Sequence, residues 1–137
     1  MNLYPKWRDH EYPANIEEMR SLSHQDLLYL IESGHTIGCH TANHLNLSSI
    51  QDNNLLRQEI IESSEELEKK IGIPVKHFSF GFGNVNFFSK QALRIAKEKY
   101  QYIHTGMRGD NAKSKLPWAL RRDTISKNHE KKNREIA

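Results

Sequence analysis

The stretch GHTIGCHTANHLNLSSI, residues 34–50, decides how the chain is interpreted, because it joins a short apolar run to a polar loop. Residues 35–39 predict a short strand, and residues 40–50 predict the loop that follows it. His40 and His44 stand four residues apart in this loop. In parallel α/β folds the loops at the carboxyl ends of strands carry the functional groups, so the two histidines are the first candidates for a site.

The segments on either side of this stretch have the spacing of amphipathic helices. Ser23 predicts the N-cap of a helix over residues 24–33, and Gly34 predicts its left-handed end. A longer helix is predicted from about residue 51 to residue 71, ended by Gly72. The apolar stripe of this helix consists of Leu56, Ile60, Leu67 and Ile71. The charged residues expected on its exposed side are Glu59, Glu62, Glu65, Glu66 and Lys69.

Further strands are predicted over residues 75–80, 100–105 and 118–125, with a helix capped by Ser89 between the first two. Helices and strands therefore alternate along most of the chain. This alternation is typical of a parallel sheet with crossover helices, which makes the expected fold class α/β, either layered or a barrel.

Composition restricts the class of protein. With 137 residues, of which 36% are hydrophobic and 27% charged, the chain predicts one folded domain rather than a disordered polymer. The single cysteine, Cys39, excludes an internal disulfide. No apolar run reaches the roughly 18 residues of a membrane span, and the first residues lack the apolar core of a signal peptide. Localisation cannot be predicted from these features.

The net charge of +3 is a weak indication of a nucleic-acid partner. Four basic residues fall within residues 127–137, but Glu130 and Glu135 stand among them. Mixed charge of this kind is typical of a solvated tail, so we expect no nucleic-acid partner. A small basic nucleic-acid-binding protein remains the least favoured of the alternatives.

Two histidines four residues apart can hold a divalent metal, because their rings can converge on one ion. The spacing alone is a weak signal in a chain with eight histidines. A catalytic zinc site also has three protein ligands and a water. The residues before His40 offer no adjacent pair of acids, because Asp9 and Asp26 are isolated.

Four segments resemble, in order, the signatures of the polysaccharide deacetylases, the carbohydrate esterases that share the NodB homology domain. Residues 40–44, HTANH, match the metal-binding pattern H-[ST]-x-x-H of that family at every defined position. Residues 75–84, VKHFSFGFGN, stand in the place of the signature F-x-[YP]-P-[YF]-G, and a strand opening at Tyr100 follows. Residues 120–125, LRRDTI, resemble the strand that carries an arginine. The resemblance covers roughly residues 20–125.

This resemblance implies a partial, distorted (β/α) barrel of the glycoside hydrolase and deacetylase type. It implies that His40 and His44 bind a divalent metal, for which zinc is the first choice. It implies hydrolysis of N-acetyl or O-acetyl groups on a polysaccharide or oligosaccharide. The backbone amide of Phe82 stands at the oxyanion position, and Phe82 and Asn84 are the candidates for contacts with the sugar. The expected domain limits are an irregular segment over residues 1–20, the partial deacetylase domain over 21–126, and a charged tail over 127–137.

The chain also departs from the family pattern. The Asp-Asp pair that supplies the catalytic base and the third metal ligand in the family has no counterpart, as if the first strand were missing. Gly81 replaces the usual proline of the third signature, and Arg121 or Arg122 has no such carboxylate to orient. His129 is a weak candidate for the general acid, because it lacks the leucine that precedes the family's histidine.

Three other residues near these motifs are interpreted as structural. Cys39 and His104 are expected to be structural strand residues, and Phe80 a core residue. If the base is missing, we expect the chain to be inactive on its own. We then also expect it to need a complementing segment for activity, or to self-associate. The main alternative to an enzyme is a non-catalytic metal- or carbohydrate-binding remnant.

Overall fold

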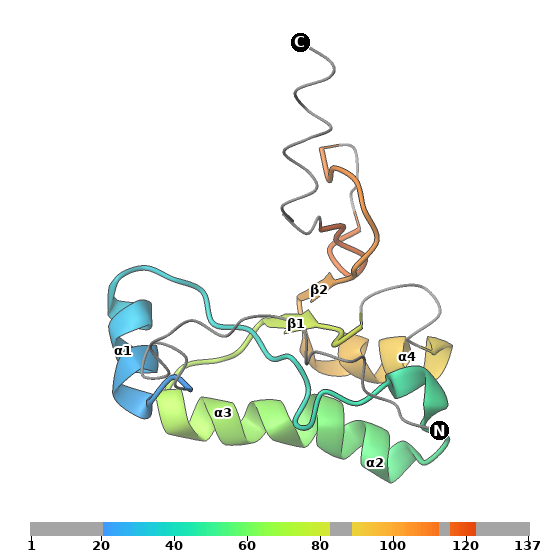
Figure 1. Cartoon of the computed structure of the whole chain (residues 1–137), viewed down its shortest axis with the longest axis horizontal. Coiled ribbons are helices and arrows are strands. Elements are labelled where there is room, and N and C mark those ends of the chain that lie inside the picture. The colour runs from blue at the N-terminus through green and yellow to red at the C-terminus, as the bar shows by residue number, and fades with distance from the viewer. Residues whose placement is uncertain (1–20, 83–88, 113–115, 123–137) are drawn as a thin grey trace, which may run out of the picture.

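Two short parallel strands lie at the centre of the structure, a computed structural model that describes residues 21–82, 89–112 and 116–122 (Figure 1). Strand β1 (His77–Ser79) pairs with strand β2 (Tyr102–His104), and Phe78 lies opposite Ile103. The parallel pairing confirms the direction of the predicted strands at residues 75–80 and 100–105.

Single bridges extend this pairing on both sides. Cys39 forms a parallel bridge to Phe78, and Leu120 forms a parallel bridge to His104. The four segments therefore stand side by side in chain order, as crossover connections predict. The strand predicted at residues 35–39 is wrong in extent, because Cys39 is the one residue of this run that bridges within the described part of the chain.

Gly38 explains how closely the chain approaches β1 before the bridge. A Cβ atom added at this position would lie 3.2 Å from both the Cβ and the carbonyl oxygen of His77. A side chain there would push the backbone away from β1. The glycine thus permits the close approach that brings the following loop against the end of β1.

The helices follow the predicted order and nearly the predicted limits. Ser23 caps the first helix through a capping box with Asp26, and Ser89 caps the last helix through the amide of Ala92. Gly72 ends the long helix with a φ of 73°. The helical elements are α1 (His24–Glu32), η3 (Leu47–Ser49), α2 (Asn53–Arg57), η4 (Gln58–Glu62), α3 (Ser63–Ile71) and α4 (Lys90–Lys99).

The long helix contains one irregular turn. Elements α2, η4 and α3 run on without a break, but η4 is a π-helical turn. A π turn bonds residue i to residue i+5 and widens the helix by one residue. Both Ile60 and Ile61 are buried in this turn. The sequence pattern predicted the helix but not this widening.

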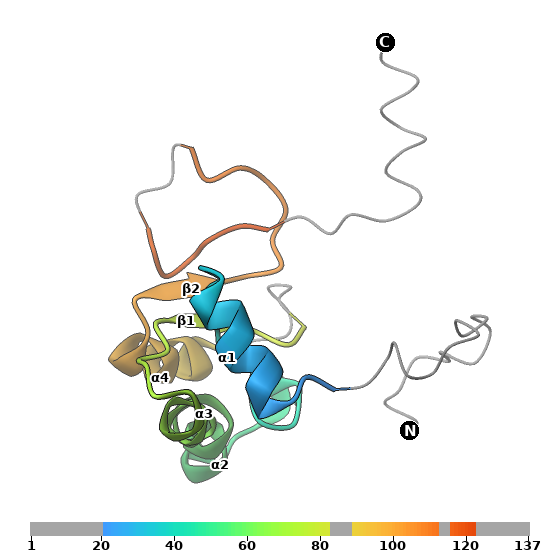
Figure 2. The same cartoon turned by 90° about the vertical axis from the view of Figure 1, so that its left-hand side faces the viewer.

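The helices cover one face of the strands, as both views show for α2, α3 and α4 (Figures 1 and 2). Alternate strand residues follow this arrangement, since Phe78 and Ile103 are fully buried while Tyr102 on the other face is 39% exposed. Phe80 is also buried, as expected for a core residue. The buried apolar core consists of Cys39, Leu47, Leu56, Ile60, Ile61, Ile71, Val75, Phe78, Phe80, Ala92, Ile95, Ala96, Tyr100 and Ile103.

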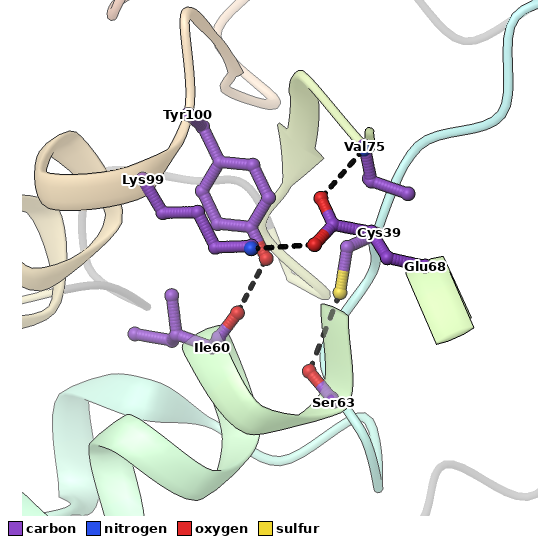
Figure 3. A network of polar contacts seen from close by, with 7 residues as sticks. All are labelled: Cys39, Ile60, Ser63, Glu68, Val75, Lys99 and Tyr100. Carbon is purple, nitrogen blue, oxygen red and sulfur yellow. Dashed lines mark hydrogen bonds and ion pairs between the residues drawn. The ribbon is translucent and has the colours of Figure 1, made fainter. Parts of the chain in front are cut away.

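A network of polar contacts closes the core between the long helix and the strands (Figure 3). The Tyr100 hydroxyl donates to the Ile60 carbonyl, and burial raises the pKa of this hydroxyl above its usual value. Glu68 accepts from Lys99 Nζ at 2.9 Å and from the Val75 amide at 2.7 Å. Burial alone would raise the pKa of Glu68, but these two hydrogen bonds and the charge of Lys99 outweigh burial and lower it.

Within the described residues, no helix combines the length and the apolar character that crossing a membrane requires.

The Tyr100 hydroxyl yields a stability prediction. Tyr100→Phe removes the donor to the buried Ile60 carbonyl, so the free energy of unfolding should fall by about 1–3 kcal/mol. Urea unfolding followed by circular dichroism measures the change. Tyr102→Phe is the matched control, because Tyr102 is 39% exposed, and this variant should stay within about 0.5 kcal/mol of the unmodified chain. Equal loss in both variants would contradict the assigned role of the Tyr100 hydroxyl.

Candidate functional site

The structure brings His40 and His44 together at the carboxyl end of the parallel segments. Their ring centroids lie 5.0 Å apart and their planes make an angle of 73°. Both residues are exposed. The loop thus presents two imidazoles side by side to solvent, at the sheet edge where α/β folds place their sites.

The loop reaches this geometry through two unusual backbone conformations. Thr41 has a φ of 69° and His44 a φ of 55°, both in the left-handed region that non-glycine residues seldom adopt. Such conformations cost about 1–3 kcal/mol each and persist where the surroundings hold them. One local contact contributes, because the His44 amide donates to Thr41 Oγ1 at 2.9 Å.

His40 is oriented by β1. Its Nδ1 atom lies 2.7 Å from the carbonyl oxygen of Ser79, the last residue of that strand. A carbonyl can only accept, so Nδ1 carries the proton and donates. In the neutral ring Nε2 then carries the lone pair, which is the arrangement of a metal-binding histidine whose other nitrogen donates to a carbonyl.

Phe82, a predicted site residue, lies beside His44. The two ring centroids are 5.0 Å apart and the rings meet edge to face at 66°. Phe82 is 43% exposed, so part of its ring remains open to solvent. The neighbouring Gly81 packs under His44, since an added Cβ would lie 3.4 Å from the imidazole ring. This contact is of ordinary van der Waals length.

A second pair of histidines lies on the same side of the sheet as His40. His77 Nδ1 is 3.0 Å from His104 Nε2, across β1 and β2. Burial lowers the pKa of His104, and the neighbouring His77 and Arg122 lower it further. A cleft of about 410 Å³ is lined by Thr36, Gly38, Cys39, His40, His77, Phe78, Ser79 and His104.

The two candidate arginines have different surroundings. Arg122 Nη2 donates to the Phe80 carbonyl at 3.0 Å, which ties the last described segment to the end of β1. Arg121 exchanges two hydrogen bonds with the side chain of Asn111 through its backbone. Arg122 thus supports the loop that carries Phe82.

Glu59 is buried and supports the histidine loop, contrary to the sequence pattern. Glu59 was expected on the exposed side of the long helix, but it is only 1% exposed. Its carboxylate accepts from the backbone amide of Asn43 at 2.9 Å and from Asn43 Nδ2 at 2.6 Å. The available signal was its position three residues after Leu56 and next to Ile60, which puts it beside the apolar stripe.

The donor set fits a divalent metal in part. Two imidazoles are suitable ligands, and that of His40 has its Nδ1 atom turned to a carbonyl. Across residues 21–82, 89–112 and 116–122, no group of three His, Cys, Asp or Glu side chains is placed to hold an ion. A metal held by His40 and His44 would need a further ligand from outside these residues. Asn84 and His129, the other predicted site residues, lie outside the described residues.

Comparison with known proteins gives one family. The sequence model described as polysaccharide deacetylase matches residues 9–102. A search of the curated proteins found no match.

Solved structures of this family are similar in fold. A polysaccharide deacetylase from Bacillus anthracis is 29% identical with a TM-score of 0.63, covering 77% of this chain and 33% of its own. One from Bacillus cereus is 26% identical with a TM-score of 0.62, covering 75% and 32%. A Streptococcus pyogenes deacetylase in complex with acetate is 23% identical with a TM-score of 0.69, covering 82% and 50%. This chain thus spans between a third and a half of the length of these structures.

The His77–His104 pair predicts a pH dependence of stability. Because the pKa of His104 is lowered on folding, the unfolded state binds a proton more readily, and the free energy of unfolding should decrease as the pH falls below about 6.5. His104→Gln keeps a hydrogen-bonding partner for His77 without titrating. Urea unfolding at several pH values between about 7 and 5 should therefore show a smaller loss for this variant than for the unmodified chain.

The exposed His35 provides the control for this measurement. His35→Gln removes one histidine outside the pair and should leave the pH dependence as it is. Identical pH profiles for His104→Gln and the unmodified chain would contradict the role assigned to the pair.

Proposed function

The chain belongs to the polysaccharide deacetylase family, and from this premise we propose that its His40–His44 loop is the metal-binding part of a hydrolase that removes acetyl groups from an acetylated polysaccharide. The support is the juxtaposition of the two rings, 5.0 Å apart, with His40 oriented by the Ser79 carbonyl. Zinc is the preferred metal, because imidazole nitrogens are among its usual ligands.

When bound, a divalent metal supplies Lewis-acid polarisation of an acetyl carbonyl and of an attacking water. The residues of the chain have roles that do not depend on which divalent metal is bound. Ser79 fixes the proton of His40 on Nδ1, so that Nε2 is the nitrogen that would bind the metal. Phe82, half exposed beside His44, offers an apolar edge to a sugar ring, and its amide is the candidate oxyanion donor. Asn84 is proposed to contact the same sugar.

The four parallel segments are proposed to be an arc of a distorted (β/α) barrel. Their chain order and the helices on one face are what such an arc requires. The catalytic base and the third ligand are then supplied from outside the described residues. A complementing segment is the proposed source, and self-association is the other proposed partnership of the chain.

A non-catalytic metal- or carbohydrate-binding role is the second candidate. It is favoured by one observation, that the described residues bring no carboxylate to His40 and His44 to complete a group of three. General-base removal costs orders of magnitude in rate, so two histidines without a base would bind but not hydrolyse.

Metal uptake tests the proposed ligands. The purified chain titrated with Co²⁺, a visible-absorbing substitute for zinc, should bind it, and His40→Ala and His44→Ala should each weaken binding by about tenfold or more, because even an outer-shell change costs about 10–100-fold. His35→Ala controls for unspecific imidazole binding and should retain the affinity of the unmodified chain. Equal affinity in all four proteins, or no uptake by the unmodified chain, would refute the ligand assignment.

Acetate release separates the two candidate functions. The chain is incubated with an N-acetylglucosamine oligomer and Zn²⁺, alone and with a polypeptide that supplies a strand ending in Asp-Asp. Under the hydrolase proposal, acetate appears only in the second mixture and disappears with His40→Ala. Metal uptake without acetate release in either mixture would instead support the binding role.

A further inference from the structure

We infer that the π turn η4 positions the two histidines, with Glu59 as the positioning residue. The inference rests on the proposed function, since it concerns the same loop, but no family signature in this chain includes Glu59. Two contacts, one from Glu59 in η4 and one from Ser63 at the start of α3, reach the residues that immediately precede the two histidines.

The first contact holds the residue before His44. Glu59 accepts two hydrogen bonds from Asn43, one from the backbone amide at 2.9 Å and one from Nδ2 at 2.6 Å. Each carboxylate oxygen takes one of the two donors, so the orientation of Asn43 is fixed by a two-point contact. The contact is shielded from water, because Glu59 is only 1% exposed. The backbone of Asn43 leads directly into the left-handed conformation of His44.

The second contact holds the residue before His40. Ser63 Oγ donates to the Glu59 carbonyl at 2.8 Å and lies 3.4 Å from the Sγ atom of Cys39, a contact drawn in Figure 3. Cys39 is itself buried and bridged to β1. Glu59 and Ser63 are four residues apart and so face the same side of the helix. One helical face thereby fixes both ends of the five-residue loop.

The π turn gives Glu59 its unusual place. A buried carboxylate is costly unless it is hydrogen-bonded, and a regular amphipathic helix keeps glutamate on its outer face. The wider turn places Glu59, Ile60 and Ile61 all in the interior. Single π turns inside α-helices often occur at functional sites, and here the turn brings a carboxylate to the loop rather than to solvent.

The variant Glu59→Gln tests this inference. The glutamine side chain keeps the shape of Glu59 but has one acceptor oxygen and one NH₂ group. One of the two Asn43 donors therefore faces the NH₂ group, which is also a donor. Amide hydrogen exchange of the metal-free chain should become about tenfold or more faster at Asn43, while the strand amides of Ser79 and Ile103 keep their rates. Unchanged exchange at Asn43 would overturn the inference, whether or not the chain binds metal.

Glu62→Gln is the matched control. Glu62 belongs to the same π turn and makes the same change of charge, but it is exposed. This variant should exchange and bind Co²⁺ like the unmodified chain. If it accelerates exchange at Asn43 as much as Glu59→Gln does, the effect belongs to the helix and not to the contact, and the inference fails.

Metal binding provides the second measurement. Co²⁺ affinity should fall about 10–100-fold in Glu59→Gln, and the visible band of the bound ion should shift, because the ring positions change while both ligands remain. Faster exchange at Asn43 with unchanged affinity and band would overturn the positioning role. No uptake by the unmodified chain would refute the proposed metal site, and the exchange rates at Asn43 would still decide whether Glu59 holds the loop.

A second variant separates loss of the contact from loss of folding. Asn43 is exposed, so Asn43→Ala should leave the core intact while it removes the Nδ2 donor. We expect a smaller decrease in Co²⁺ affinity than in Glu59→Gln, because the backbone hydrogen bond remains. An affinity equal to that of the unmodified chain in a folded Asn43→Ala protein would count against the two-point contact.

Discussion

The geometry of the site depends on two backbone hydrogen bonds of a single residue, Cys39. Its amide donates to the His77 carbonyl at 2.8 Å, and its carbonyl accepts from the Ser79 amide at 2.9 Å. These two bonds fix the chain to β1 immediately before the loop. His40 therefore leaves the sheet beside the end of the strand, where its ring meets the Ser79 carbonyl. The loop then turns back through Asn43, which Glu59 holds, and the ring of His44 lies beside Phe82.

The helices were predictable because their signals are local. Caps at Ser23 and Ser89, a glycine stop at Gly72 and a repeated apolar stripe depend only on residues within a few positions of one another. The strands were found in place and direction but not in length. Pairing is non-local, so the apolar pattern of residues 35–39 could not indicate that Cys39 is the residue of this run that bridges to β1 in the described part of the chain.

The distinction between local signals and non-local contacts applies to the site as well. The spacing of His40 and His44 and the family pattern indicated a pair, and the structure brings their rings together. Glu59 was missed because its charge assigned it to the exposed side, although its position three residues after Leu56 puts it beside the apolar stripe. The structure buries it within the π turn, together with Ile60 and Ile61.

The π turn also links the core to the loop. The Tyr100 hydroxyl donates to the carbonyl of Ile60, the residue next to Glu59, and so connects the segment before β2 to the turn that holds Asn43. Packing and positioning are therefore not separable here, because one turn serves both the buried network and the exposed histidines. The described part of the chain holds the histidine pair and its support on one helix and one strand. The histidine loop is therefore positioned by contacts that all lie within this part.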